Sequence, residues 1–171
     1  MGVQVSVPGR IAEELRRRGM VLSAVVEALM KLLSLEPKAK ARLELAERHL
    51  KEGKEYLARE DPVQASEKLY KVVEECIKAL SEHYSLGILR EVEKEGRWRT
   101  WLLGSASREL AGKLNEPRIA DAWARAYDVH VWGQEAKYGM EEVEADLPHV
   151  EWLFEYTKQT NKQLTAELLD G

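Results

Sequence analysis

Apolar and polar residues alternate at the start of the chain and recur at helical spacing later on. Residues 3–7 alternate valine with polar residues before a proline, which predicts a short half-buried strand. Residues 11–19 predict a helix ended by a glycine, and residues 23–33 predict a second helix that the serine at its start is placed to cap. We therefore expect a small strand-helix-helix segment over 1–34 and a separate domain over 35–171.

From Pro37 onward the apolar residues recur at steps of three and four, which is the period of an amphipathic helix. Asp61 and Pro62 end the first of these helices and suit the start of the second, and so short a connection makes the two antiparallel neighbours. The third helix is expected to be interrupted near Gly96 or Gly104. The fold class is therefore all-α, an antiparallel up-and-down helical bundle, with helices expected over 43–57, 62–84, 87–114, 117–133 and 148–169.

Composition places the chain among soluble globular proteins of the cytoplasm. It has 171 residues, of which 44% are apolar and 33% are charged. Cys76 is the only cysteine, so no internal disulfide can form, and this favours a reducing compartment. No apolar run approaches the ~20 residues that span a bilayer, and the N-terminus lacks the order of a signal peptide. We expect a cytoplasmic protein with no membrane partner.

Charge is distributed unevenly, but no segment is basic enough to bind nucleic acid by bulk charge alone. The segments 1–34, 35–84, 85–119 and 120–171 carry formal net charges of +2, −1, +2 and −7. Short basic stretches occur at Arg16-Arg17-Arg18 and at Arg97-Trp98-Arg99-Thr100-Trp101. A solvated helix face is our preferred interpretation of each stretch.

The layout of residues 1–34 resembles a ribbon-helix-helix unit, in which paired strands set polar side chains into the DNA major groove. That resemblance implies Gln4 and Ser6 as base-reading residues, with Arg10 and residues 16–18 as phosphate contacts. We favour the alternative that this segment docks on the main body or on a second subunit.

The sequence offers no recognisable metal, cofactor or phosphate-loop motif. Glu141, Glu142, Glu144, Asp146 and His149 are dense in possible ligands, but a proline at 148 interrupts any single helical face. A solvated acidic linker is the preferred interpretation of that stretch. Cys76 stands within an apolar stripe and is expected to be a buried hydrophobe rather than a nucleophile.

Two segments resemble the PaREP family of archaeal helical proteins. They are Leu57-Ala58-Arg59-Glu60-Asp61-Pro62-Val63-Gln64-Ala65-Ser66-Glu67-Lys68-Leu69-Tyr70-Lys71, continuing to Leu80, and Ala122-Trp123-Ala124-Arg125-Ala126-Tyr127-Asp128-Val129-His130-Val131-Trp132-Gly133. That family in turn resembles the HEPN superfamily of four-helix domains, which are associated with nucleotides, nucleotidyltransferases and RNA cleavage. The resemblance implies a HEPN-like bundle for residues 35–171.

The HEPN ribonucleases carry an Arg-x4–6-His motif, and Arg125 and His130 have that spacing. The resemblance implies a metal-independent endoribonuclease, with His130 as acid or base and Arg125 as the cation that stabilises the phosphorane. Two such motifs usually meet at a dimer interface in that superfamily. Ala126 departs from the pattern, because a polar residue commonly follows the arginine.

Helical geometry favours a structural interpretation of the same pair. Five residues at 100° each place Arg125 and His130 about 140° apart around a regular helix. His130 then shares a stripe with apolar residues, and Arg125 lies between Asp121 and Asp128 on a solvated face. A hydrogen-bonded core histidine and a solvated arginine are therefore the alternative.

The preferred functional hypothesis is a non-catalytic module that binds a nucleotide, an RNA or a partner protein. Interleaved aromatic and guanidinium groups can stack on bases and contact phosphates, and the residues expected to do so are Arg97, Trp98, Arg99, Trp101 and Trp132. The number of tryptophans exceeds what one small core readily hides, so we also expect a homodimer.

Overall fold

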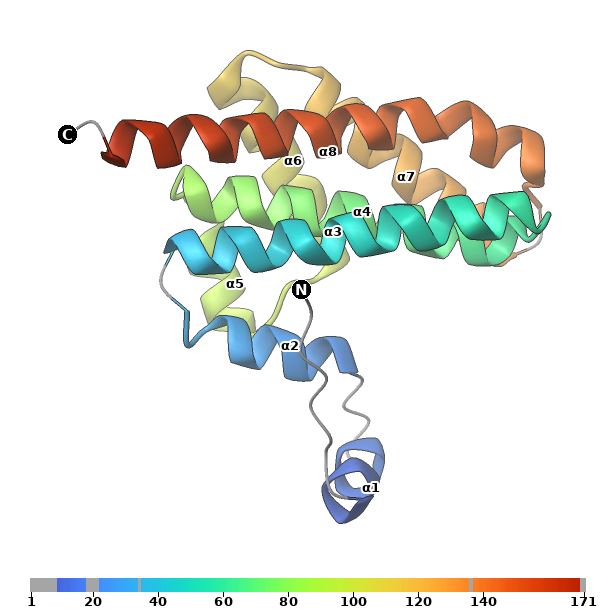
Figure 1. Ribbon diagram of the computed structural model, residues 1–171, viewed down its shortest axis with the longest axis horizontal. Coiled ribbons are helices and arrows are strands. Elements are labelled where there is room, and N and C mark those ends of the chain that lie inside the picture. Colours follow the sequence, from blue (N-terminus) through green and yellow to red (C-terminus); the bar gives the residue numbers. More distant parts are fainter. Residues whose placement is uncertain (1–8, 18–21, 34, 136, 170–171) are drawn as a thin grey trace. The chain divides into compact units, whose positions relative to one another are not determined.

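The computed structural model describes the backbone of residues 9–17, 22–33, 35–135 and 137–169, and all of their regular structure is helical (Figure 1). The chain divides into two compact units, Met1–Ser34 and Leu35–Gly171. Eight helices occur among the described residues: α1 (Gly9–Arg17), α2 (Leu22–Met30), α3 (Leu35–Ala58), α4 (Pro62–His83), α5 (Leu89–Glu95), α6 (Thr100–Leu114), α7 (Arg118–Gln134) and α8 (Met140–Leu169). The all-α class is confirmed.

In the smaller unit, α1 and α2 confirm the two helices predicted there, with one difference. Ser23 lies inside the first turn of α2 and does not precede it as a cap. The strand predicted over 3–7, together with Gln4 and Ser6, lies outside the described residues, and no strand occurs in the part of the chain that the structure describes.

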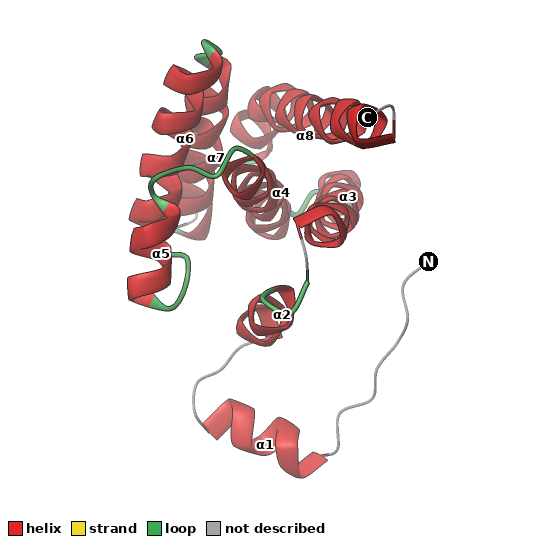
Figure 2. Cartoon of the chain, turned by 90° about the vertical axis from the view of Figure 1, so that its left-hand side faces the viewer, coloured by secondary structure: helices red, strands yellow, loops and turns green. Residues whose placement is uncertain are grey.

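Helix α4 is the centre of the larger unit (Figure 2). It contacts α3, α6, α7 and α8 and buries residues on all sides, as a helix enclosed by neighbours must. Seven residues of its predicted apolar stripe are buried, namely Ala65, Leu69, Val72, Val73, Cys76, Ile77 and Leu80. Tyr84, expected on the same stripe, follows the last turn of the helix and is only partly buried. The surrounding helices therefore take their positions from α4.

Short connections set the directions of the helices. Asp61 caps α4, its side chain accepting a hydrogen bond from the Gln64 amide at 3.0 Å, and Pro62 occupies the first turn. The turn that joins α3 to α4 spans only Arg59 to Asp61, so these helices are antiparallel, as predicted. The expected interruption of the third helix occurs at Gly96, whose φ of +71° ends α5, and Gly104 lies within α6.

The acidic linker predicted before Pro148 is wrong, because α8 begins at Met140 and continues through the proline. The Gly139 amide donates to Glu142 Oε2 at 2.8 Å, which satisfies an amide at the helix start, and Val143 is fully buried one turn later. Proline removes one helical hydrogen bond, but Pro148 is exposed, so water can reach the carbonyl left without a donor. None of the described helices is both long and apolar enough to cross a membrane.

Candidate functional site

The basic and aromatic stretch predicted to bind ligands lies at the start of α6. Arg97 and Arg99 are exposed, and Arg99 donates from Nε to Glu95 Oε2 at 3.2 Å. Trp101 is 55% exposed. Trp98 is more buried than Trp101, because its ring packs against the core. It is therefore less accessible for stacking on a ligand.

Helix α6 meets α7 at Gly104, three residues after Trp101, and Trp123 of α7 lies against this glycine. A methyl group on Gly104 would lie 3.1 Å from Trp123 Nε1 and 3.7 Å from Arg108 Nη1. Trp101, Gly104 and Arg108 share one face of α6 because they stand three and four residues apart. The guanidinium of Arg108 therefore lies over the glycine, beside the buried indole of Trp123.

Tyr127 completes this surface from α7. Its ring stacks on Trp123, with centroids 6.0 Å apart and an interplanar angle of 13°, and its side chain is 42% exposed. Within the described part of the chain, Arg108 makes no hydrogen bond or ion pair. We call Trp101, Arg108, Trp123 and Tyr127 the α6–α7 aromatic face.

Tyr70 of α4 connects this face to the predicted catalytic histidine. Its ring packs against Trp123, with centroids 5.6 Å apart, and stacks on His130, with centroids 4.3 Å apart. Burial, reinforced by Glu74, raises the pKa of Tyr70 well above its usual value. Tyr70 is therefore a neutral phenol that fixes the His130 ring.

His130 is partly accessible, with 26% of its side chain exposed. Its Nδ1 lies 3.3 Å from Glu67 Oε2, but the two atoms do not have the geometry of a hydrogen bond. The same nitrogen is shielded from solvent. Gln134 also approaches the same Glu67 oxygen, at 3.4 Å. A carboxylate beside one ring nitrogen is an arrangement that can orient an imidazole.

Arg125 does not join His130 within one chain. Its Nη1 donates to Asp146 Oδ1 of α8 at 3.0 Å, and half of its side chain is exposed. The two residues therefore make their contacts with different helices, α8 and α4, on different sides of α7.

Trp132 also lies apart from the other predicted binding residues. Its Nε1 donates to Asp128 Oδ1 at 2.9 Å, and the other oxygen of that carboxylate accepts from the Tyr138 hydroxyl at 2.9 Å. Trp132 stands 140° around α7 from Tyr127, which removes it from the α6–α7 aromatic face.

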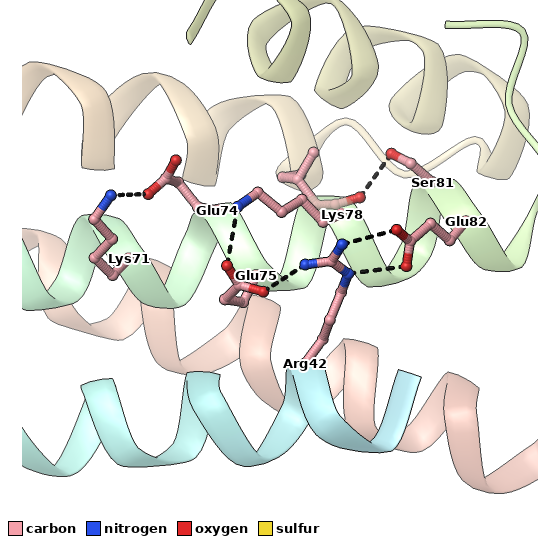
Figure 3. Close-up of polar contacts among 8 residues, drawn as sticks. Arg42, Lys71, Glu74, Glu75, Lys78, Ser81 and Glu82 are labelled. Carbon is pink, nitrogen blue, oxygen red and sulfur yellow. Dashed lines mark hydrogen bonds and ion pairs between the residues drawn. The ribbon is translucent and has the colours of Figure 1, made fainter. Parts of the chain in front are cut away.

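A charged network lies between α3 and α4 (Figure 3). Arg42, whose side chain is 2% exposed, donates from Nε and Nη2 to the two oxygens of Glu82 at 2.9 and 2.8 Å. Its Nη1 donates to Glu75 Oε2 at 2.8 Å, and Lys78 donates to the other Glu75 oxygen at 3.0 Å. Two cations face two carboxylates, so the network is balanced and structural in character.

Neither metal binding nor a reactive thiol adds to the candidate site. No cluster of metal-ligating side chains occurs among the residues that the structure describes. Cys76 is fully buried. Burial raises the pKa of its thiol to about 12, an effect that a hydrogen bond with Thr157 only partly offsets.

Sequence reasoning missed Arg108 and Tyr127 as members of the candidate site. Arg108 stands seven residues after Trp101, and Tyr127 stands four after Trp123, so helical spacing alone places each pair on one face. Spacing alone could not show that Gly104 lets α6 approach α7, which is what brings the two pairs onto one surface.

All regular structure among the described residues is helical, and the larger unit is built around α4, with a mixed aromatic and basic face on α6 and α7. The sequence model of the archaeal PaREP1/PaREP8 family matches residues 41–154, and the chain belongs to this family. The matched region begins within α3, ends within α8 and includes every residue of the α6–α7 aromatic face.

A protein from Sulfolobus solfataricus, known from its crystal structure, is similar in both sequence and fold. The two are 34% identical with a TM-score of 0.62, over 67% of this chain and 94% of that one. No curated protein matches the chain.

Proposed function

We propose that the protein is a non-catalytic binding module whose α6–α7 aromatic face takes a nucleotide or a single-stranded RNA. One observation carries this proposal: Arg108, which has no partner among the described residues, shares a face of α6 with the exposed ring of Trp101 and lies near Gly104 with Trp123, on which the exposed ring of Tyr127 stacks. An exposed ring offers a stacking platform to any base, and a guanidinium offers a fork of donors to a phosphate.

The chemistry of this face divides between its two kinds of side chain. A base stacks on the outer surface of Tyr127 or on Trp101, since Trp123 already covers the inner surface of Tyr127. The phosphate then contacts Arg108, with Arg97 near the start of α6 as a further cation. A protein partner, the other ligand that the sequence favours, would use the same exposed rings without needing the arginine.

The test is a titration followed by tryptophan emission. The full chain is titrated with adenosine monophosphate, uridine monophosphate and an eight-nucleotide RNA, at low and at high salt. We expect salt-sensitive quenching that Trp101→Leu reduces and Arg108→Gln weakens. Trp132→Leu and Arg90→Gln change an exposed tryptophan and an exposed arginine elsewhere, and both should bind as the parent chain does. If no probe changes the emission, only protein partners remain.

We propose in addition that residues 35–171 form a HEPN-like bundle, in which α3, α4, α7 and α8 supply the four principal helices. Their contacts with one another and the short connections of the α3–α4 and α7–α8 pairs support this assignment.

A metal-independent endoribonuclease is the second candidate function, favoured by the setting of His130. Stacking on Tyr70 and the nearby Glu67 carboxylate hold its ring in one orientation, as an acid or base requires. The 2′-oxygen of RNA would attack phosphorus, one group taking its proton, while another protonates the leaving 5′-oxygen. Arg125 would have to come from the second chain of a dimer, because it does not reach His130 within its own.

This candidate makes a distinct prediction for RNA incubated with a chelator. Purified protein should cleave single-stranded RNA and leave a 2′,3′-cyclic phosphate, and His130→Ala should abolish cleavage while the circular dichroism spectrum is unchanged. If His130 is only a packing residue, the same variant loses stability and the parent chain shows no cleavage to lose.

A further inference from the structure

We infer that a second site, formed by Trp132, Tyr138 and Asp128, binds a small alkylammonium cation such as the head group of choline. The site lies where α7 ends and α8 begins, at one end of the larger unit (Figure 1). Trp132 stands about 140° around α7 from Tyr127, so the site is separate from the α6–α7 aromatic face and does not depend on the function proposed for it. We call these three residues the Trp132–Tyr138 wedge.

The backbone that follows α7 folds back onto the helix and places two aromatic rings together. The amides of Lys137 and Tyr138 both donate to the Trp132 carbonyl, at 2.9 and 3.3 Å. The rings of Trp132 and Tyr138 lie with their centroids 6.5 Å apart and their planes inclined at 42°, and Trp132 is 40% exposed. A ligand can therefore reach positions within about 6 Å of both centroids, which is the range over which a cation is attracted to a ring face.

Asp128 gives the wedge a negative charge that no cation of the described residues neutralises. Its Oδ1 accepts from Trp132 Nε1 and its Oδ2 accepts from the Tyr138 hydroxyl, each at 2.9 Å. Both donors are neutral, so they satisfy hydrogen bonds and leave the charge uncompensated. Asp128 is exposed and makes no ion pair within the described part of the chain. Donation to a carboxylate also makes both rings richer in electrons, which strengthens their attraction for a cation.

Further carboxylates act on the Tyr138 side of the wedge. The hydrogen bond to Asp128 is the main cause that raises the pKa of the Tyr138 hydroxyl, and the charges of Glu142 and Asp146 add to it. Asp146 is paired with Arg125 at 3.0 Å. Glu142 accepts from the Gly139 amide at 2.8 Å and makes no ion pair among the described residues. The electrostatic potential beside the tyrosine ring therefore favours a positive ligand.

The hydrogen bonds of the wedge select the kind of cation. Both oxygens of the Asp128 carboxylate already accept a hydrogen bond, so a primary ammonium or a guanidinium would find few acceptors for its donors on leaving water. A quaternary ammonium carries no N–H donor and needs only the charge of the carboxylate and the faces of the rings. An alkylated cation therefore fits these three residues better than an unsubstituted one.

The experiment follows the indole N–H signals of the five tryptophans by nuclear magnetic resonance in the full, isotope-labelled chain. Choline chloride is titrated in against sodium chloride at equal ionic strength, and the Trp132 signal is identified by its loss in Trp132→Leu. We expect a saturable shift of the Trp132 signal while the Trp101 signal stays in place. The neutral analogue of choline, in which a tert-butyl group replaces the trimethylammonium group, should shift neither signal. Methylammonium should bind more weakly than choline.

Matched variants test the other two members of the wedge through the same Trp132 signal. Tyr138→Leu removes one ring and Asp128→Asn removes the charge, and each should weaken choline about fivefold or more. Asp121→Asn, at an exposed aspartate of the same helix, should leave its dissociation constant unchanged. Lys137→Gln should tighten choline, because it removes an exposed like charge next to Tyr138. Unmoved signals of the other tryptophans show that each variant is folded.

The inference is overturned if choline gives no saturable shift of the Trp132 signal beyond that of sodium. An equal shift by the neutral analogue would also overturn it, because the charge would then be unnecessary. Tighter binding of methylammonium than of choline would reject the alkylated class, and unchanged binding by Asp128→Asn would reject the role of the carboxylate. None of these results affects the α6–α7 aromatic face, whose nucleotide titration depends on Trp101 and Arg108.

Discussion

The Arg42 guanidinium on α3 binds both carboxylate oxygens of Glu82 on α4, forty residues further along the chain, at 2.9 and 2.8 Å. This bidentate pair fixes the register of α3 against α4, because a slip by one residue would separate the groups. Because the Glu82 side chain is only 13% exposed, removal of Arg42 would leave its carboxylate largely buried without the cation that it binds.

Removing Arg42 should therefore destabilise the protein strongly. We expect Arg42→Met to lower the free energy of unfolding by about 3 to 5 kcal/mol, measured by urea denaturation at pH 7. Arg48→Met, on an exposed position of the same helix, is the control and should change it by less than about 0.5 kcal/mol. The double variant Arg42→Met/Glu82→Leu should recover part of the loss, since Glu75 keeps Lys78. A loss below about 1 kcal/mol for the single variant would contradict this account.

The helices of the larger unit could be predicted from the sequence because their apolar stripes are regular and their ends carry strong signals, such as Asp61 and Pro62. Pro148 misled the prediction, since the last helix was expected to begin at this proline, whereas α8 begins at Met140 and tolerates the proline at an exposed position inside it. The Arg42 network could not be predicted either. Charged residues at helical spacing indicate a solvated face, and only the packing of α3 on α4 shows that these are enclosed.

His49 of α3 predicts how stability depends on pH. Its Nδ1 lies 3.7 Å from Glu52, which pairs with Lys68 of α4 at 2.7 Å. Burial and the nearby Lys68 lower the pKa of His49 below 6.5, with Glu52 and Glu75 opposing and Lys71 adding to the effect. Below pH 6.5 the unfolded chain therefore binds a proton that the folded chain does not, and stability falls as the pH decreases.

The measurement is urea denaturation between pH 7.5 and pH 5, a range that lies above the lowered pKa of Glu52. We expect the parent chain to lose stability over this range and His49→Gln to lose less. His149→Gln, which removes a histidine for which no such contacts occur among the described residues, should follow the parent chain. Identical slopes for the parent chain and His49→Gln would show that another group causes the decline.

Self-association should occur through the smaller unit. Leu29, Leu32 and Leu33 lie at the end of α2 and just after it, with 58%, 80% and 40% of each residue exposed. Three exposed leucines within five residues form the kind of apolar surface that an isologous dimer covers. Light scattering should therefore give a mass of about 39 kDa, twice the chain mass of 19.6 kDa. The double variant Leu29→Gln/Leu32→Gln should give the monomer mass, whereas the control Trp101→Gln should keep the dimer mass. A monomeric parent chain would exclude the dimer, and with it the ribonuclease site shared between two chains.

The candidate site was only partly predictable, for a reason that Trp98 and Trp132 illustrate. Sequence spacing identified aromatic and basic residues but not which of them a neighbouring helix would cover. Trp98 packs on the core, and Trp132 is held by Asp128, so neither joins Trp101. Tyr127 does, because its ring stacks on an indole that α6 approaches closely at a glycine.

Two glycines in the helices should respond in opposite directions to alanine. A methyl group on Gly133 of α7 would lie 2.6 Å from Ser66 Oγ and 3.1 Å from Ser66 Cβ, and that hydroxyl is already engaged with the Val63 carbonyl at 2.8 Å. Gly133→Ala must therefore displace the Ser66 hydroxyl from the Val63 carbonyl or push α7 away from α4, and we expect a loss of about 1 to 3 kcal/mol in urea denaturation. Gly112 of α6 has no atom within 4 Å of the same position, so Gly112→Ala should gain up to about 1 kcal/mol from the lower entropy of the unfolded chain. Ser66→Gly should relieve most of the cost of Gly133→Ala, since it removes the atoms that clash. If Gly133→Ala is as stable as Gly112→Ala, the close approach of α7 to α4 at this point is wrong.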